Sequence, residues 1–213
     1  AIVAPSASAL ANLLRIEPRF ATLSTQVIAH GLRPFPTRDR ATTAAPPPKA
    51  LAGKGSSKAS ARGLRVLVLG RINAGKGARL LDTLTRPVPA GIEFHLLGCG
   101  AAGMAFFGRD HVDIEFDYRR DELPAAIARI APDVALLPVT VAETFSYTLS
   151  ELRALGVPVL ATRIGSLAER IVDDVDGWLV APDADTIKDE LVLLARERSR
   201  LGLIRERLAT AEV

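Results

Sequence analysis

Two cationic and two acidic side chains are the residues of this sequence whose types and spacing could bind a ligand together. Arg71 and Lys76 lie in the segment GRINAGKG (70–77), directly after a buried apolar run. Glu143 and Glu151 lie eight positions apart and follow another such run. If each apolar run is a strand of a parallel sheet, all four side chains lie at the carboxyl edge of that sheet, where ligands bind in such folds.

The cationic pair suits a phosphate group. Lys76 lies near the start of a helix predicted over 75–84, where a cation opposes the helix dipole unless an anion is bound there. Arg71 adds a planar fork of donors that matches phosphate oxygens. Segment 70–77 also has the G-x4-G-K spacing of a phosphate loop, but Gly77 stands where a Ser or Thr would bind magnesium. Nucleotide hydrolysis at a phosphate loop and two merely solvated cations are the alternatives to phosphate binding.

The acidic pair suits hydroxyl binding better than acid–base catalysis. In one continuous helix, eight residues separate two side chains by about 80° around the axis and about 12 Å along it. A hydrolytic couple would need its two carboxyl groups closer together. We therefore expect Glu143 in a loop and Glu151 on the following helix, each binding a different hydroxyl. The alternative is that Glu143 only stabilises the start of that helix and that Glu151 is a surface residue.

Six apolar runs separated by helical patterns must position these residues. The predicted strands are 64–70, 92–98, 112–116, 133–138, 158–162 and 178–180. Their alternation with helices predicts an α/β fold, a Rossmann-like parallel sheet with helices on both faces. Asp121 is predicted to cap the helix after the third strand, and Ser166 with Glu169 is predicted to form a capping box. A single long helix is predicted over 184–210.

The first 62 residues differ in composition from the rest. Ser6 can cap a helix that ends near Ile16, and residues 25–32 are predicted to form a short strand. Segment 41–62 has three consecutive prolines, scattered Gly, Ser and Lys, and no acid, so we predict a flexible linker. The first 62 residues hold nine Lys or Arg against two acids, a net charge of +7. Residues 63–213 therefore hold 18 against 22, a net charge of −4.

Charge and composition exclude several classes of protein. The acidic main domain argues against nucleic-acid binding, which needs clustered cations. A single cysteine, Cys99, excludes an internal disulfide framework and fits a reducing cytoplasm, and the three scattered histidines do not suggest a zinc site. No apolar run is long enough to span a membrane. The basic N-terminal part could associate peripherally with the cytoplasmic face of a membrane, or simply be solvated. The sequence opens with neither methionine nor a secretory signal, and we expect it to be part of a longer protein.

The order and spacing of these motifs over residues 64–182 resemble the C-terminal, donor-binding domain of the retaining GT-B glycosyltransferases, often called group 1 or family four transferases. The shared motifs are GR-x4-KG, LGCG, Glu143-x7-Glu151, GVPVLAT, GSLAER and DGWLVAP. Residues 1–32 resemble the end of that family's N-terminal domain. The resemblance therefore implies three parts. They are the tail of the acceptor domain with the crossover (1–40), a flexible linker (41–62) and a Rossmann-like domain that binds a nucleotide sugar (63–213).

The resemblance implies a transferase that moves a sugar from a nucleotide-diphosphate sugar to a glycan or lipid-linked acceptor, in the synthesis of a cell-surface polysaccharide. By resemblance, Arg71 and Lys76 bind the diphosphate, Glu151 binds the ribose hydroxyls and Glu143 binds a hydroxyl of the sugar. No cofactor and no metal are implied. Catalytic residues are expected in the N-terminal domain, so we expect the isolated chain to bind nucleotide weakly and to transfer little sugar.

The loop before the predicted helix departs from the family pattern. The resemblance implies that backbone amides of Phe145, Ser146 and Tyr147 contact the sugar and the β-phosphate. The family usually has glycine at the positions of Thr144 and Ser146, and Ala-Met-Ala at 152–154. Larger residues here could alter donor choice or weaken binding. A sugar-nucleotide epimerase of the same fold, a phosphate-loop nucleotide-binding protein and a non-catalytic binding module are the alternative functions.

Overall fold

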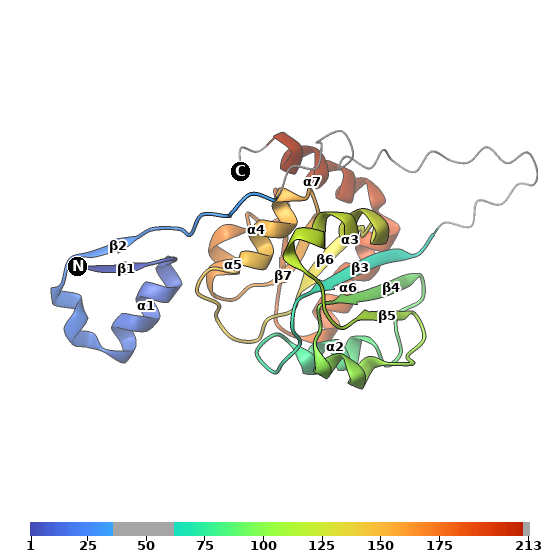
Figure 1. Cartoon of the computed structure of the whole chain (residues 1–213), viewed down its shortest axis with the longest axis horizontal. Coiled ribbons are helices and arrows are strands. Elements are labelled where there is room, and N and C mark those ends of the chain that lie inside the picture. The colour runs from blue at the N-terminus through green and yellow to red at the C-terminus, as the bar shows by residue number, and fades with distance from the viewer. Residues whose placement is uncertain (36–61, 211–213) are drawn as a thin grey trace, which may run out of the picture.

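A six-stranded parallel sheet forms the centre of the protein in the computed structural model, which describes residues 1–35 and 62–210 (Figure 1). The strands are β3 (Leu64–Leu69), β4 (Ile92–Leu97), β5 (Val112–Glu115), β6 (Val134–Leu137), β7 (Val159–Thr162) and β8 (Trp178–Val180). They lie in the order β5-β4-β3-β6-β7-β8, and each neighbouring pair is parallel. The predicted Rossmann-like α/β fold is confirmed, and each of the six strands predicted for this sheet differs from the observed one by at most one residue at either end.

Helices cover both faces of this sheet. On one face lie α2 (Ala78–Leu84), α6 (Ala184–Arg196) and α7 (Arg198–Thr210); on the other lie α3 (Leu123–Ile130), α4 (Tyr147–Ala154) and α5 (Gly165–Arg170). Successive strand residues point to opposite faces, so within β3 Val66 and Val68 join the first core while Leu67 and Leu69 join the second. Because both faces are buried, the strands read as continuous apolar runs.

A separate small unit precedes the sheet. It consists of β1 (Ile2–Ala4), α1 (Ala7–Ile16), the 3-10 helix η1 (Pro18–Thr22) and β2 (Thr25–Val27), with β1 and β2 parallel. Ser6 caps α1 as predicted, because its Oγ accepts a hydrogen bond from the Ala9 N–H at 3.1 Å. The predicted strand over 25–32 is shorter than expected and ends at Val27. Figure 1 shows this unit projecting beside α4 and α5.

Two helix predictions were wrong. Asp121 does not cap α3; it lies in the 3-10 helix η4 (Arg120–Glu122), and its carboxylate binds the guanidinium of Arg119 at 2.9 Å. The predicted single helix over 184–210 is two helices, because Glu197 leaves the helical conformation and separates α6 from α7. The break lets α7 take its own direction, in which its arginines reach the amino edge of the sheet.

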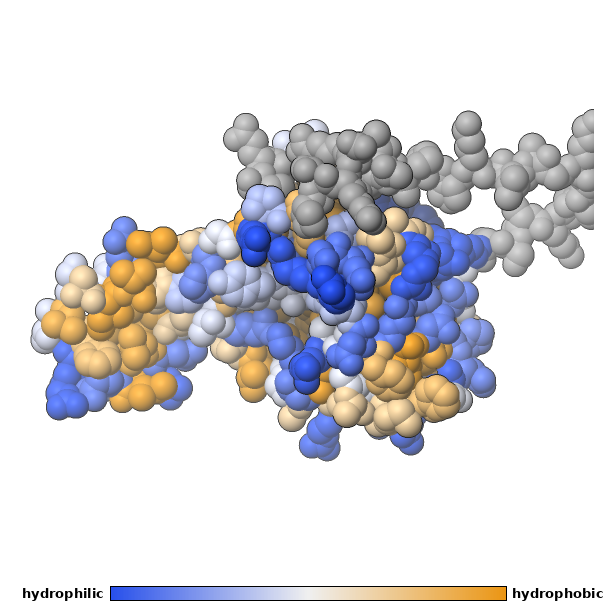
Figure 2. Space-filling model, in the orientation of Figure 1, coloured by the Kyte–Doolittle hydropathy of each residue, from blue (hydrophilic) through white to orange (hydrophobic). Residues whose placement is uncertain are grey.

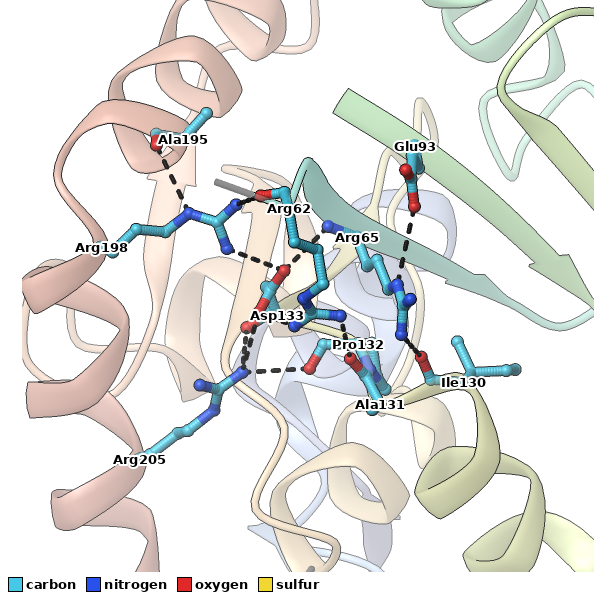
Figure 3. A network of polar contacts seen from close by, with 10 residues as sticks. All are labelled: Arg62, Arg65, Glu93, Ile130, Ala131, Pro132, Asp133, Ala195, Arg198 and Arg205. Atoms are coloured by element: carbon cyan, nitrogen blue, oxygen red, sulfur yellow. Dashed lines mark hydrogen bonds and ion pairs between the residues drawn. The ribbon is translucent and has the colours of Figure 1, made fainter. Parts of the chain in front are cut away.

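Asp133 is the centre of a polar network at that amino edge, just before β6 (Figure 3). Its buried carboxylate lies 2.9 Å from the guanidinium of Arg62 and 2.9 Å from that of Arg198. It also accepts a hydrogen bond from the backbone N–H of Arg65 at 2.9 Å. Arg205 approaches to 3.8 Å and donates to the carbonyl oxygens of residues 132 and 133. One carboxylate therefore joins the start of β3, the start of β6 and the helix α7.

The predicted linker over 41–62 lies outside the described residues except for Arg62. Within the described ranges, the helices include none with both the length and the apolar composition needed to cross a bilayer.

Candidate functional site

A pocket opens at the carboxyl edge of the sheet, between the ends of β3 and β6. The order of the strands reverses here, since β4 follows β3 on one side while β6 adjoins it on the other. Parallel α/β sheets bind ligands at such a switch point, because the loops leaving the two strands diverge. The polar side chains that line the pocket are Arg71, Lys76, Glu143, Ser146 and Thr148. Four of the seven predicted site residues therefore lie around one pocket.

The loop between β3 and α2 brings the two cations to the pocket. It is longer than predicted, because α2 begins at Ala78 rather than at Gly75. Asn73 closes the loop by accepting the Lys76 N–H at its side-chain oxygen, 2.9 Å away. Gly77 has φ 79°, and a Cβ on it would lie 1.9 Å from the Pro138 carbonyl oxygen. Glycine is therefore required for contact between the loop and the end of β6, which explains why this position holds no magnesium-binding hydroxyl.

Lys76 and Glu143 form an ion pair across the pocket. The side chain of Glu143 is 14% exposed and that of Lys76 is 44% exposed, so the carboxylate is the more enclosed partner. A cation near the start of a helix is stabilised by a nearby anion. In this structure that anion is the carboxylate of Glu143. Arg71 extends along the same rim, past Gly100, whose absent Cβ would lie 3.8 Å from the Arg71 Cγ.

Glu151 lies on α4 and binds a different cation. It is 8% exposed, and its Oε1 accepts a hydrogen bond from the Arg120 Nε at 2.7 Å. Arg120 also donates to the carbonyl oxygen of Arg33 at 2.6 Å and packs over the ring of Phe35, 4.6 Å from its centroid. Glu143 lies in the loop and Glu151 on the helix, as predicted, and the two carboxylates bind different cations. This arrangement does not resemble an acid–base couple.

The three residues predicted to offer backbone amides have different surroundings. Phe145 is buried, Ser146 lines the pocket, and Tyr147 is 51% exposed. The ring of His30 stacks on Tyr147 with centroids 5.5 Å apart and meets the edge of Phe145 at 5.1 Å. Within residues 1–35 and 62–210, the backbone N–H groups of residues 145–147 have no hydrogen-bond partner. Ser146 has φ 65°, in the left-handed conformation that favours glycine.

The strand β4 ends in a turn that admits an aromatic ring. Gly98 and Gly100 have φ values of 74° and 65°, as expected for a tight turn. A Cβ on Gly98 would lie 2.5 Å from the ring of Tyr118, so glycine is required for this packing. Burial raises the pKa of the Tyr118 hydroxyl, and the charge of Glu151 raises it further. Burial also raises the pKa of the Cys99 thiol, which disfavours the reactive thiolate form.

The short helix α5 holds the loop that carries Glu143. Gly165 packs so closely on the loop that a Cβ on it would lie 2.9 Å from the Ala142 Cα. The predicted capping box of Ser166 and Glu169 was wrong. Ile164 is the N-cap, and the Oγ of the buried Ser166 has no hydrogen-bond partner in the described part of the chain. The carboxylate of Glu169 instead accepts the N–H groups of residues 7 and 8 at 2.9 and 2.6 Å, at the start of α1.

Sequence reasoning missed two arginines of this region. Arg120 binds Glu151, and Arg170 donates hydrogen bonds to the carbonyl oxygens of Phe145 and Ser146. Arg120 follows the end of β5 and could have been found from the rule that the strand ends meet at one edge. Arg170 ends a helix and carries no such signal. Around the pocket, Arg71 and Lys76 can bind an anion and the carboxylate of Glu143 can accept a hydrogen bond from a hydroxyl group, whereas Glu151 does not line the pocket.

Comparisons with known proteins identify the family and the fold. The model of the family described as "Glycosyl transferases group 1" matches residues 63–197. A search against curated protein sequences returned no match. Among solved structures, the HepE protein of Anabaena, in complex with UDP and glucose, is similar to the chain with a TM-score of 0.70 and 17% identity. This match covers 97% of the chain and 56% of HepE.

Two further structures show the same fold. The catalytic domain of starch synthase IV from Arabidopsis thaliana, bound to ADP and acarbose, matches with a TM-score of 0.66 and 17% identity, over 99% of the chain and 51% of that protein. The C-terminal domain of the group 1 protein LpcC from Francisella tularensis matches with a TM-score of 0.54 and 22% identity, over 68% of the chain and 82% of that domain. The chain thus spans about half the length of HepE and of the starch synthase domain. The match of the family model over more than half of the sequence shows that the chain belongs to the family of group 1 glycosyl transferases.

Proposed function

We propose that the chain is the donor-binding half of a glycosyltransferase that uses a nucleotide-diphosphate sugar. One observation carries the proposal: in a member of this family, Arg71, Lys76, Glu143 and Ser146 line a single pocket at the switch point of the sheet. HepE with UDP and starch synthase IV with ADP share the fold, which supports a nucleoside diphosphate as the ligand class.

The two cations account for how such a site favours transfer. When the bond between the sugar and the diphosphate breaks, negative charge develops on the leaving β-phosphate oxygens. Arg71 and Lys76 stabilise this charge best if they are already aligned in a pocket partly shielded from water. Arg71 supplies a fork of two parallel donors, and Lys76 supplies a compact charge. The diphosphate takes the place at Lys76 that the Glu143 carboxylate holds in this structure.

Release of Glu143 from Lys76 suits the role proposed for this carboxylate. Once the diphosphate neutralises Lys76, the carboxylate of Glu143 accepts a hydrogen bond from a hydroxyl of the sugar. Glu151 accepts from the ribose hydroxyls, and its carboxylate also pairs with the guanidinium of Arg120. The acceptor is a glycan or a lipid-linked glycan, and the product contributes to a cell-surface polysaccharide. Catalytic groups that contact the acceptor come from a second domain.

Calorimetric titration of the chain with UDP, GDP, ADP and dTDP tests the proposal. We expect one of these nucleotides to bind and Arg71→Ala to weaken that binding at least about tenfold, since a hydrogen bond to a charged group contributes about 1.5–3 kcal/mol. Arg86→Ala is the matched control, because Arg86 is 62% exposed and, among the described residues, pairs only with Asp82, four residues before it. If none of the four nucleotides binds, or if both variants weaken binding equally, the proposal fails.

A further inference from the structure

Arg170 is an arginine that, within the described residues, binds backbone carbonyl groups rather than a carboxylate. It is the last residue of α5 and half-buried. In the described part of the chain no carboxylate pairs with it, and its hydrogen bonds go to Phe145, Ser146 and Ser150. Burial lowers the pKa of its guanidinium, and the nearby charge of Arg153 lowers it further. Burying a charge without a paired carboxylate costs free energy. The charge alone therefore does not explain why Arg170 makes these hydrogen bonds.

Those contacts all hold one turn. One nitrogen of the guanidinium donates to the carbonyl oxygens of Phe145 and Ser146, the latter at 3.0 Å. The other nitrogen donates to the Ser150 Oγ at 2.7 Å. The guanidinium also lies over the Phe145 ring, with its Cζ 3.9 Å from the ring centroid. The two carbonyl groups lie on either side of the Cα of Ser146, the residue with φ 65° and ψ 82°.

The orientation of these carbonyl groups fixes the orientation of two N–H groups. Within a planar trans peptide, the C=O and the N–H point in opposite directions. When Arg170 binds the carbonyls of Phe145 and Ser146, the N–H groups of Ser146 and Tyr147 must point away from it. A serine in the left-handed region is strained, because its Cβ crowds the backbone, whereas a glycine would not be. Two hydrogen bonds from Arg170 offset that strain and keep the turn in one conformation.

We propose that Arg170 is a positioning residue for the donor: it holds the turn at Ser146 so that the N–H groups of Ser146 and Tyr147 face the β-phosphate or the sugar. The proposal rests on the function proposed above for the same pocket. It assigns a cause to the positive φ of Ser146: the hydrogen bonds from Arg170 hold a serine in a conformation that favours glycine.

A double-mutant experiment on the whole chain tests the proposal, with the best-bound nucleotide of the panel UDP, GDP, ADP and dTDP as the probe. We expect Arg170→Met to weaken binding at least about tenfold, since the turn loses two charge-assisted hydrogen bonds. Arg170→Lys should weaken it less, because an ammonium keeps the charge without the planar fork. Ser146→Gly alone should change binding by less than about threefold, and it should recover most of the loss in Arg170→Met. Arg86→Met, which removes an exposed arginine that pairs with Asp82 and does not line the pocket, is the control and should leave binding within about twofold.

A second measurement needs no ligand. A residue with positive φ gives a strong NMR cross-peak between its own amide and α protons, because that conformation brings the two protons close together. We expect this signal at Ser146 in the wild type and its loss in Arg170→Met. If no nucleotide of the panel binds the wild type, the proposed function fails, while the NMR signal still decides whether Arg170 holds the turn. Binding unchanged in Arg170→Met overturns the proposal, as does a loss that Ser146→Gly does not recover.

Discussion

At the scale of single residues, a change at Lys76 should affect nucleotide affinity much more than it affects the stability of the fold. Because Lys76 is 44% exposed, its ion pair contributes only about 0–1 kcal/mol to folding. A diphosphate bound in the pocket would interact with the same ammonium group in an environment that contains less water than the exposed ion pair has. We therefore predict that Lys76→Met lowers affinity for the bound nucleotide at least about tenfold, while the free energy of unfolding changes by less than about 1 kcal/mol. Calorimetry and urea unfolding measure the two effects.

The control for this prediction is Lys188→Met, on the exposed surface of α6. It removes the same charge at a residue that does not line the pocket. It should therefore change neither the nucleotide affinity nor the free energy of unfolding. A large loss of stability in Lys76→Met, with affinity unchanged, would show that the lysine is structural.

Gly77 allows a second prediction at this scale, because Gly91 provides a matched comparison. Both have positive φ, 79° and 78°, but a Cβ would clash with the Pro138 carbonyl only at Gly77, while it would meet nothing within 4 Å at Gly91. Gly91→Ala should cost about 1 kcal/mol, the backbone strain alone. Gly77→Ala should cost about 2–4 kcal/mol, since the loop must also move away from β6. Equal unfolding midpoints in urea for the two variants would contradict the close approach.

At the scale of elements, the Asp133 network should be the strongest single polar contribution to stability. Asp133→Asn leaves Arg62, Arg198 and Arg205 near one another without their carboxylate. Removing one partner of a fully buried pair costs about 3–5 kcal/mol, but these arginines are 37–41% exposed, so we predict about 2–4 kcal/mol. Asp110→Asn, an exposed change of the same kind, is the control. Urea unfolding of both variants measures the difference, and a loss below about 1 kcal/mol for Asp133→Asn would contradict it.

The N-cap of α6 gives a pH dependence whose sign can be worked out. The side-chain and backbone hydrogen bonds from Thr186 lower the pKa of the Asp183 carboxyl below its ordinary value of 3.8. The charged form is therefore favoured by folding, so its stabilising effect is present above pH 3.8 and is lost as the pH falls through the folded pKa. Asp183→Asn keeps a capping oxygen that does not titrate. We predict that the wild type loses stability relative to this variant below about pH 4, as measured by urea unfolding over a pH series. A constant difference would contradict the prediction.

The sequence predicted the sheet well and the polar loops poorly, for a physical reason. Buried parallel strands are apolar along their whole length, so β3 and β6 could be located to within a residue. The place of Glu143 in a loop and Glu151 on a helix followed from their spacing. The acceptor of a cap was harder to predict, because a local pattern does not reveal a partner far away in the chain. Ser166 and Glu169 fit the pattern of a capping box, yet Glu169 caps α1, about 160 residues earlier in the sequence.

At the scale of the whole molecule, the N-terminal unit exposes an apolar surface. The helix α1 has an apolar face but no buried residue. Large exposed hydrophobic residues gather on this unit, as Figure 2 shows, and they include Val3, Ile16, Leu23, Val27 and Ile28. A contiguous apolar surface of this kind is typical of one that contacts another protein surface.

We predict that the isolated chain self-associates through this unit. Ile16→Ser, at a residue that is 73% exposed, should reduce association and hydrophobic-dye binding, with stability changed by less than about 0.5 kcal/mol. Leu203→Ser, at a residue 55% exposed on α7, is the control and should leave association unchanged. Analytical ultracentrifugation over a range of concentrations measures the effect. If the wild type is monomeric throughout, or if both variants behave alike, the prediction is wrong.

The neighbouring residues Glu169 and Arg170 connect the start of α1 to the turn at Ser146 through α5. Glu169 accepts hydrogen bonds from the start of α1, and Arg170 donates to the turn at Ser146, so adjacent residues of a six-residue helix contact both segments. A helix this short has little freedom to bend, so we expect a movement of α1 to shift the turn as well. We therefore expect the orientation of the N-terminal unit to be coupled to that of the Ser146 and Tyr147 amides. A donor that changes the conformation of the turn would then alter the contacts of α1. A partner that moves α1 would in turn alter the affinity for the donor.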